Sequence, residues 1–505
     1  MKRRLPSVAV LIIATIAVVA AQEGYIVGDV LKVSEIQDSL GNQVIDVDNR
    51  EGVLEEITIN KTHVGADFIV YPDGGTYTVI YGNNLSVAYT DTDPTAAIEW
   101  AINALPSGGG KVVLASGTYT LTSTIDITKS NVELAGSGFS TELVMRNWAD
   151  VHTIMVDGAS GVKIRDLYIY VPLTYHRNYY AIYFKDSSNS EVTGCRIVGY
   201  DASVFITNSN HISVSGNLIE AQGYYGVYIG SSECCRVVNN KMKGHYPVYV
   251  TSSYSTIVSN NQIYYSYNAG IHLHYSNDSI ISSNRISGGE GIGIELYDSD
   301  KNVVANNKIT TYTRAIDYAM VLYLSDKNVV IGNEIMDCYD KREVFNVTAL
   351  YIDRSDGNIV ASNVFVNNTG YGIYITEGYD NVIKNNDVSG NGLGSIIDDG
   401  FGTVIRGNAG YITENSGKLT NIPINGTGGA LQKFPIAHGL SVPSTDDDFR
   451  VTLTLTEPTA TDFTVELLYW QPNTTNTDYF DAFIKVTDSL TEGATVNCTW
   501  TAWVR

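Results

Sequence analysis

The stretch that decides the fold is Asn210-His-Ile-Ser-Val-Ser-Gly-Asn217-Leu-Ile219, because close variants of it recur along the chain. Two of them are Lys301-Asn-Val-Val-Ala-Asn-Asn307-Lys-Ile309 and Asp380-Asn-Val-Ile-Lys-Asn-Asn386-Asp-Val388. The final asparagine recurs at positions 217, 240, 261, 284, 307, 333, 363, 386 and 408, with Cys195 in the same place one unit earlier. Most steps are 21 to 23 residues, the length of one solenoid coil.

Each unit holds two or three short runs of alternating apolar residues, separated by Gly, Asn, Ser or Asp. This pattern predicts strands and turns and leaves no room for a helix, so the fold class is all-β, a parallel β-helix of about ten coils. The recurring asparagine falls at one turn of every coil. We expect its amide to bond the asparagines above and below while its own backbone is left-handed, an inert structural ladder.

Residues 91 to 145 carry a family resemblance. The motifs are Asp93-Pro-Thr-Ala-Ala-Ile98-Glu-Trp-Ala101-Ile102, Gly108-Gly-Gly-Lys-Val-Val-Leu, Ser116-Gly-Thr-Tyr119 and Asn131-Val-Glu-Leu-Ala-Gly136-Ser-Gly138. They resemble the opening of the pectate-lyase-like superfamily, which includes rhamnogalacturonase- and epimerase-like proteins. The repeats also resemble those of periplasmic copper-associated (NosD-like) β-helix proteins. The resemblance implies a right-handed parallel β-helix and a polysaccharide or other glycan as partner.

The catalytic motifs of the enzyme families are missing from the expected coils. Polygalacturonases carry Asn-Thr-Asp, Asp-Asp, Gly-His-Gly and Arg-Ile-Lys on successive coils, whereas this helix has only Asp398-Asp399 in a late coil. The Arg-x-Pro-x-x-Arg set of calcium-dependent pectate lyases is absent as well. No catalytic residue is therefore carried over from the families.

A short amphipathic helix is expected at the start of the β-helix. Asp93 suits an N-cap and Pro94 a first helical residue, and the apolar residues Ile98, Ala101, Ile102 and Leu105 share one helix face. Such a helix would cover the open end of the first coil.

Composition suggests five segments. Residues 1–21 have the basic start, apolar run and small residues of a signal peptide, with an uncleaved anchor as the alternative, and no stable membrane span is expected after its removal. Next come a small β module at 22–90, the β-helix at 91–416 and a linker at 417–429. Alternating runs at 430–505 predict an antiparallel β-sandwich. It resembles modules of tail-fibre proteins, which would imply a homo-oligomer, a trimer.

Charge and cysteine content narrow the function. The 32 basic and 54 acidic residues give a net charge of −22, which repels phosphate backbones and argues against nucleic acid as a partner. Five scattered cysteines indicate core fillers rather than a disulfide scaffold or zinc site. Eight Asn-x-Ser/Thr sequons fit a secreted or cell-surface glycoprotein; they lie at Asn60, Asn84, Asn277, Asn346, Asn367, Asn425, Asn473 and Asn497.

One strand of each coil has an outward residue between two inward apolar ones. Following this slot gives a column of aromatic residues interrupted by one His and one Glu: Tyr183, Phe205, Tyr228, Tyr249, His272, Glu295, Tyr323, Tyr351 and Tyr374. Exposed aromatic rings can stack on sugars, which makes the aromatic members candidate substrate-binding residues. Cross-strand packing is the structural alternative.

The break in the column is the candidate catalytic site. His272 and His274 point the same way, and the next coil offers Glu295 and Tyr297, so we expect all four on one exposed sheet face. In β-elimination of a uronic acid a histidine would be the base, and Arg342 or Lys341 would hold the carboxylate. In hydrolysis Glu295 would need a second carboxylate, from Glu290 or Asp317.

The same residues also allow non-catalytic roles. The His-x-His pair with Glu295 could ligate a metal, or could simply be exposed. The acidic runs Asp398-Asp399 and Asp446–Asp448 suggest solvated turns, with Ca²⁺ binding as the alternative and no other cofactor indicated. Long coils near residues 171–180, 307–333 and 333–363 would wall a groove beside the column. Two functions follow, a polysaccharide lyase or glycoside hydrolase and a non-catalytic surface glycan binder.

Overall fold

The computed structural model describes residues 65–146, 152–171, 179–310, 318–340 and 346–411 in full, with backbone strands in the flanking segments. The chain forms an all-β solenoid of about 12 turns with one short helix. The sequence estimate of about ten was low because the first coils, before Gly161, lack the recurring asparagine. The chain divides into two compact units, Met1–Glu295 and Leu296–Arg505.

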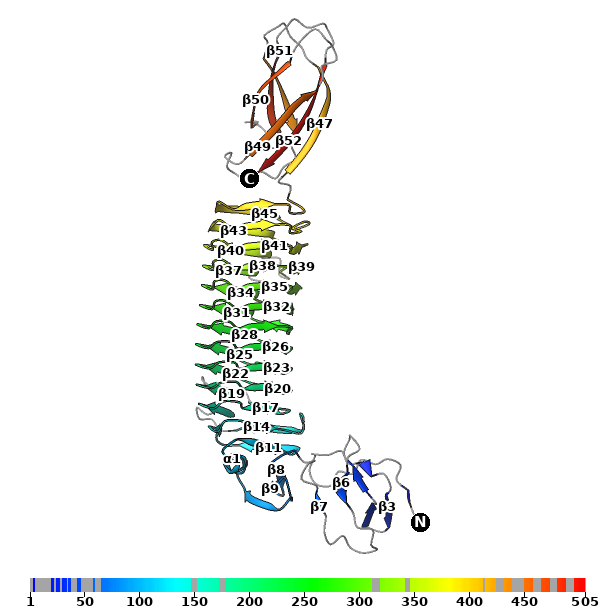
Figure 1. The fold of residues 1–505 in the computed structure, drawn as a ribbon, viewed down its shortest axis with the longest axis vertical. Coiled ribbons are helices and arrows are strands. Elements are labelled where there is room, and N and C mark those ends of the chain that lie inside the picture. The colour runs from blue at the N-terminus through cyan, green and yellow to red at the C-terminus, as the bar shows by residue number, and fades with distance from the viewer. Residues whose placement is uncertain are drawn as a thin grey trace. The chain divides into compact units, whose positions relative to one another are not determined.

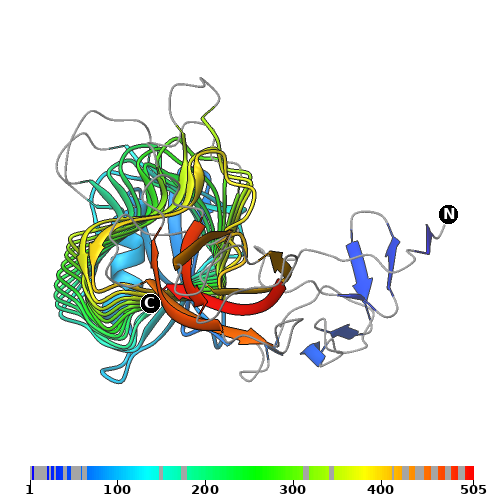
Figure 2. The ribbon, with the colours of Figure 1, turned by 90° about the horizontal axis from the view of Figure 1, so that it is seen from above.

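In the first unit each coil adds a strand to three sheets, called first, second and third in chain order (Figures 1 and 2). The first sheet contains β8 (Phe68–Asp73), β9 (Thr76–Tyr81), β10 (Val87–Asp91), β11 (Gly110–Leu114), β14 (Val132–Ala135), β17 (Lys163–Arg165), β20 (Glu191–Thr193), β23 (Ser213–Ser215), β26 (Arg236–Val238), β29 (Ile257–Ser259) and β32 (Ile280–Ser282). The second contains β12 (Gly117–Leu121), β15 (Thr141–Met145), β18 (Tyr168–Tyr170), β21 (Arg196–Val198), β24 (Leu218–Glu220), β27 (Lys241–Gly244), β30 (Gln262–Ser266) and β33 (Arg285–Ser287). The third contains β13 (Ile125–Ile127), β16 (Ile154–Asp157), β19 (Tyr180–Lys185), β22 (Ala202–Thr207), β25 (Tyr225–Gly230), β28 (Tyr246–Thr251) and β31 (Ala269–His274).

The second unit repeats this plan, and β34 (Ile292–Tyr297) contains the boundary between the units. Its first sheet has β35 (Val303–Ala305), β38 (Val329–Ile331), β41 (Ile359–Ala361), β44 (Val382–Lys384) and β46 (Val404–Arg406). Its second sheet has β36 (Lys308–Thr310), β39 (Glu334–Met336) and β42 (Val364–Val366). Its third sheet has β37 (Tyr318–Tyr323), β40 (Thr348–Asp353), β43 (Tyr371–Tyr379) and β45 (Gly394–Phe401).

The predicted amphipathic helix is present as α1 (Pro94–Ala104). The Asp93 side chain accepts a hydrogen bond from the backbone N–H of Thr95, as expected of an N-cap. Ile98, Ala101 and Ile102 are buried against the first strands. Among the residues that the structure describes, no helix is long and apolar enough to cross a membrane.

The core consists of apolar columns that run from coil to coil. In the third sheet of the first unit one such column is fully buried and consists of Ile182, Val204, Val227, Val248 and Ile271. Branched side chains in register fill the interior, and the alternation of strand side chains turns the residue after each of these, such as Tyr183 and Tyr228, to the outer face.

The predicted asparagine ladder is confirmed. In the first unit the Nδ2 of Asn217 donates to the Oδ1 of Asn240 at 3.0 Å, and the contact repeats through Asn261 to Asn284. A like ladder in the second unit joins Asn307, Asn333, Asn363, Asn386 and Asn408. Cys195 occupies the expected slot, since its backbone N–H donates to Asn217.

One detail of the predicted asparagine ladder was wrong, the position of the left-handed backbone. The left-handed backbone belongs to the residue before each ladder asparagine, such as Gly216, Asn239 and Asn260. That residue makes the turn, so the ladder asparagine points its amide inward and donates its own N–H to the next coil, as Asn217 does to Asn240.

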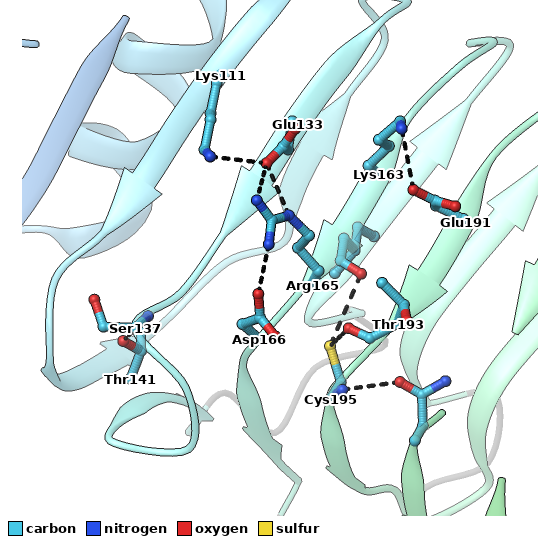
Figure 3. A network of polar contacts seen from close by, with 12 residues as sticks. Lys111, Glu133, Ser137, Thr141, Lys163, Arg165, Asp166, Glu191, Thr193 and Cys195 are labelled. Carbon is cyan, nitrogen blue, oxygen red and sulfur yellow. Dashed lines mark hydrogen bonds and ion pairs between the residues drawn. The ribbon is translucent and has the colours of Figure 1, made fainter. Parts of the chain in front are cut away.

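The first coils are joined by charges on the outer face of the first sheet (Figure 3). Lys111, Glu133, Lys163 and Glu191 are successive cross-strand partners of alternating sign. Glu133 pairs with Lys111 at 3.1 Å and with Arg165 at 2.6 Å, and Lys163 pairs with Glu191 at 3.2 Å. Burial opposes the effect, but the hydrogen bonds from Arg165 and Lys111 lower the pKa of Glu133. Here each cation meets a carboxylate of the same sheet.

The flanking segments form further strands. Residues after 411 form two three-stranded antiparallel sheets, β47 (Glu414–Pro423), β52 (Thr495–Val504) and β49 (Phe449–Thr456), and β48 (Leu431–Ala437), β51 (Tyr479–Val486) and β50 (Val465–Pro472). Their packing as a sandwich stays a prediction. The strands β8 to β10, within the predicted N-terminal module, join the first sheet. The signal segment, the rest of that module and the linker lie outside the fully described residues.

Candidate functional site

The predicted aromatic column exists in the first unit, on the outer face of the third sheet. Tyr183, Phe205, Tyr228, Tyr249 and His272 are successive cross-strand partners. Each lies between buried residues that point inward, so all five point outward.

The rings of this column stack mainly on one another. The ring centroids of Phe205 and Tyr228 are 4.3 Å apart, those of Tyr228 and Tyr249 5.6 Å, and those of Tyr249 and His272 4.8 Å, all nearly parallel. Ring faces inside the stack are therefore occupied by neighbouring rings. This packing disfavours sugar stacking on the faces of Tyr228 and Tyr249, which stays a prediction, and ring edges and hydroxyl groups remain for a ligand.

Sequence reasoning missed a second set of rings at the start of the same strands. Tyr180, Tyr225 and Tyr246 lie beside the column, and the Tyr180 ring stacks on Phe205 at 3.8 Å. Their signal is a repeated Tyr-x-x-Tyr, present at 180–183, 225–228 and 246–249. Two consecutive buried residues separate the tyrosines of each pair, so the chain bends at the strand start and both rings face outward.

The tyrosine hydroxyl groups stay protonated at neutral pH. Burial raises the pKa of Tyr225, Tyr228 and Tyr246, and burial followed by repulsion from neighbouring tyrosines raises the pKa of Tyr249 to about 12. Each hydroxyl can therefore donate and accept a hydrogen bond.

The column ends on a short contact between His272 and Glu295. The Nδ1 of His272 lies 2.6 Å from the Oε2 of Glu295 and donates to it when the carboxylate is ionised. His272 is only 8% exposed, so the expectation of an open position was wrong for this residue. Tyr246 and Tyr249 pack against its ring and cover it.

The other predicted catalytic residues are half-buried beside aromatic rings or lie outside the described residues. His274 shares a strand with His272, is half-buried, and its Nδ1 lies 3.3 Å from the Tyr249 hydroxyl. Tyr297 is half-buried and packs on Tyr323 at 4.9 Å. Arg342, Lys341 and Asp317 lie outside the described residues, as do the tips of the loops expected to wall a groove.

The alternative carboxylates have structural partners. Glu290 accepts a hydrogen bond from the Tyr265 hydroxyl at 3.1 Å. Asp398 accepts from the backbone of Gly400 and from Thr403, which ties it into its own turn. Asp446–Asp448 lie outside the described residues.

In the second unit the predicted column is correct for Tyr351 and Tyr374 but wrong for Tyr323. Tyr351 pairs with Tyr374, whereas its partner on the preceding strand is Val321. Tyr323 pairs with Asp353 instead. The sequence pattern Leu322-Tyr323-Leu324 was misleading because Leu324 is exposed at a left-handed turn, and the buried pair is Met320 and Leu322.

Tyr323 has a defined role in its own column. The Nη2 of Arg354 donates to the Tyr323 hydroxyl at 2.6 Å, and the guanidinium lies over the ring, 4.7 Å from its centroid. Arg354 is also paired with Asp353 at 3.4 Å. The positive charge of Arg354 is therefore paired with Asp353 and with the ring of Tyr323.

With this geometry in view, the sequence matches the family described as periplasmic copper-binding protein (NosD) over residues 161–338 and 313–421, together more than half of the chain. The chain belongs to the NosD family. Among curated proteins none matches the sequence significantly.

Solved structures share the fold at low sequence identity. The Dettilon tailspike protein has a TM-score of 0.57 and 15% identity, covering 82% of this chain and 92% of its own. The A-module of the Azotobacter vinelandii mannuronan C-5 epimerase AlgE6 has a TM-score of 0.52 and 16% identity, covering 62% and 95%. DFA-IIIase from Arthrobacter chlorophenolicus A6 without its lid has a TM-score of 0.51 and 15% identity, also covering 62% and 95%. At this identity the likeness concerns the fold.

Proposed function

We propose that this NosD-family chain is an exported protein that binds a neutral extracellular polysaccharide along the outer face of the third sheet. The observation that carries the proposal is the register of Tyr183, Tyr228 and Tyr249, which places half-buried tyrosines in line on this face. The Tyr183 hydroxyl lies 3.1 Å from that of Thr207 and the Tyr249 hydroxyl 3.3 Å from the Nδ1 of His274, but each hydroxyl has one donor and two acceptor positions and can still bond to a sugar. Sugar hydroxyls pair well with such donors and acceptors. Ring stacking fixes the tyrosines before binding, so little side-chain entropy is lost.

The charges of this face favour a neutral sugar. Among the described strands β13 to β31 its fixed cation is Lys185, and that side chain is paired with Asp157 at 3.3 Å. Burial, followed by repulsion from Asp157, raises the pKa of Asp126 on the same face. A uronate carboxylate would meet no compensating charge from these strands and would be repelled by their acids.

The test removes hydroxyl groups and keeps the rings. A triple Tyr→Phe variant at 183, 228 and 249 should lose about tenfold or more in affinity on a glycan array, at roughly 0.5–1.5 kcal/mol for each hydrogen bond. The control is the same change at Tyr81, Tyr254 and Tyr379, which are exposed and outside the column. Unchanged binding in the first variant, or equal losses in both, would reject the site.

Catalysis is the second candidate, favoured by the contact between His272 and Glu295. A carboxylate on Nδ1 fixes the tautomer of a histidine and leaves Nε2 as the base, the arrangement used in proton abstraction. His272 would remove a sugar proton in a lyase, with Arg342 or Lys341 on the uronate carboxylate, whereas in a hydrolase Glu295 would act with a second carboxylate. Turnover by His272 variants tests this candidate.

Copper, named in the family description, does not fit the described residues. Within the ranges given above, no group of three or more His, Cys, Asp or Glu side chains is arranged to hold a metal ion. Cys195, Cys235 and Cys338 are buried in the core, and the Nδ1 of His272 is engaged by Glu295. Among the described residues the alternative of a His-x-His metal site with Glu295 is therefore not supported, and no step is derived through copper.

A further inference from the structure

A different face of the first unit carries a line of positive charge. On the outer face of the second sheet the successive cross-strand partners are Arg196, Leu218, Lys241, Gln262 and Arg285. Cations thus occupy alternate coils, about 10 Å apart at the usual strand spacing. Lys241 and Arg285 are exposed, and Arg196 is half-buried.

Aromatic rings of the same sheet hold two of these cations in place. The Arg196 guanidinium lies over the Tyr168 ring, 4.8 Å from its centroid, and the Lys241 ammonium lies 5.4 Å from the centroid of Tyr264. Cation–π contacts restrict long side chains without neutralising them. The cations are therefore positioned and keep their charge.

The neighbouring column of this sheet adds one carboxylate and one more cation. Glu220 lies 3.7 Å from Arg196 and 3.6 Å from Lys243. The second-sheet strands from β21 to β33 carry Arg196, Lys241, Lys243, Arg285 and Glu220, which give 4 − 1 = +3, and Glu290, which accepts from Tyr265 of this sheet, reduces the sum to +2. In a chain of net charge −22 this is a local reversal of sign.

The first sheet shows what structural pairing looks like in the same unit. There Lys111 faces Glu133 and Lys163 faces Glu191, so charges of opposite sign alternate and neutralise one another (Figure 3). In the second-sheet column the intervening residues are Leu218 and Gln262, which neutralise nothing. Stabilising pairs between neighbouring strands do not require cations at alternate positions with uncharged residues between them.

We propose that this face binds an anionic polysaccharide, one that carries carboxylate or sulfate groups, with its chain lying across the coils. In an extended chain alternate sugars present the same side, and two sugars span a length close to two strand spacings. Arg196, Lys241 and Arg285 would then each meet the acidic group of every second sugar. A straight column of regularly spaced cations fits a linear polyanion of matching repeat.

The experiment measures binding of fluorescent polygalacturonate oligomers to the full chain by anisotropy. The double variant Lys241→Gln and Arg285→Gln should weaken binding about tenfold at low salt, because two exposed charge contacts to the polyanion are lost. Added salt should weaken binding of the unmodified protein and reduce this difference. Heparin fragments compare sulfate with carboxylate as the recognised group.

The matched control is Lys163→Gln with Arg236→Gln, which removes two exposed charges from the first sheet. It should bind polygalacturonate nearly as well as the unmodified protein. The triple Tyr→Phe variant of the third sheet should also bind it normally, so failure of this inference is distinct from failure of the proposed function. Equal losses in both charge variants, no binding of either polyanion, or tighter binding to duplex DNA or anionic vesicles would overturn the inference.

Discussion

The first unit contains two ladders that run in parallel through its coils and differ in what they leave exposed. The inner ladder, Asn217 to Asn284, is almost fully buried, and each amide both donates to and accepts from its neighbours. The outer ladder, Tyr183 to Tyr249 ending on the buried His272, covers its ring faces but keeps the edges of the Tyr183 to Tyr249 rings half-exposed. Regular repetition therefore indicates stacking in both, and only the outer ladder has hydroxyl groups on a half-exposed face, where a ligand can reach them.

The outer ladder also ends differently from the inner one. The asparagine contact repeats at about 3 Å, whereas the aromatic column changes to a histidine that contacts Glu295 at 2.6 Å. His272 and Glu295 are two titratable groups in short contact, and they lie where the repeating ring packing ends. Such a place is a natural candidate for catalysis. Substitutions in each ladder can therefore separate a structural role from a functional one.

The largest effect is expected at the end of the outer ladder. On a polysaccharide that the protein turns over, His272→Ala should lower the rate about 10² to 10⁴-fold, the usual loss of a positioned general base. His274→Ala is the matched control and should retain most of the activity. A lyase would generate an unsaturated uronide that absorbs in the near ultraviolet, and a hydrolase would not. Full activity of the His272 variant would place the chemistry elsewhere.

The inner ladder should respond in stability instead. Asn240→Ala removes the acceptor of the Asn217 side chain and backbone and the donor to the Val214 carbonyl, leaving buried polar groups unpaired. We expect a loss of about 2–4 kcal/mol in the free energy of unfolding, measured in urea. Asn210→Ala, at an exposed position, should cost less than about 0.5 kcal/mol. Similar costs at both positions would contradict the ladder's structural role.

A smaller effect should separate packing from binding within the outer ladder. Phe205 lies between the rings of Tyr180 and Tyr228, so Phe205→Ala should cost about 1–2 kcal/mol in unfolding free energy. Tyr228→Phe keeps the ring and should change that free energy by less than about 0.5 kcal/mol while weakening glycan binding. A large stability loss in the Tyr228 variant would make its hydroxyl structural.

The sequence predicted the inner ladder well because its signal is a single residue type at a fixed step. It predicted the outer column from Tyr183 to Glu295 because buried residues on both sides define the outward slot. The same rule, an outward residue between two buried apolar ones, failed at Tyr323. Leu324 is apolar but exposed, because it lies just beyond the end of the strand. The burial of His272 could not be predicted, since it depends on rings of neighbouring coils, among them Tyr246, whose outward direction requires a bend at the strand start.

The smallest expected effect concerns pH, which the inner asparagine ladder cannot sense because it has no titratable group. On the outer surface His245 packs between the rings of Tyr224 and Tyr267, and burial lowers the pKa of His245. The unfolded chain then takes up this proton at higher pH than the folded chain, so stability is complete above about pH 6.5 and declines as pH falls below it. His245→Phe keeps a ring and removes the proton site, so its thermal midpoint should fall slightly less than that of the unmodified protein between about pH 7.5 and about pH 5. The control is Tyr267→Phe, which changes no group that titrates in this range, so its thermal midpoint should fall as much as that of the unmodified protein. If the midpoint falls equally in all three proteins, the His245 contact contributes nothing to the pH dependence of stability.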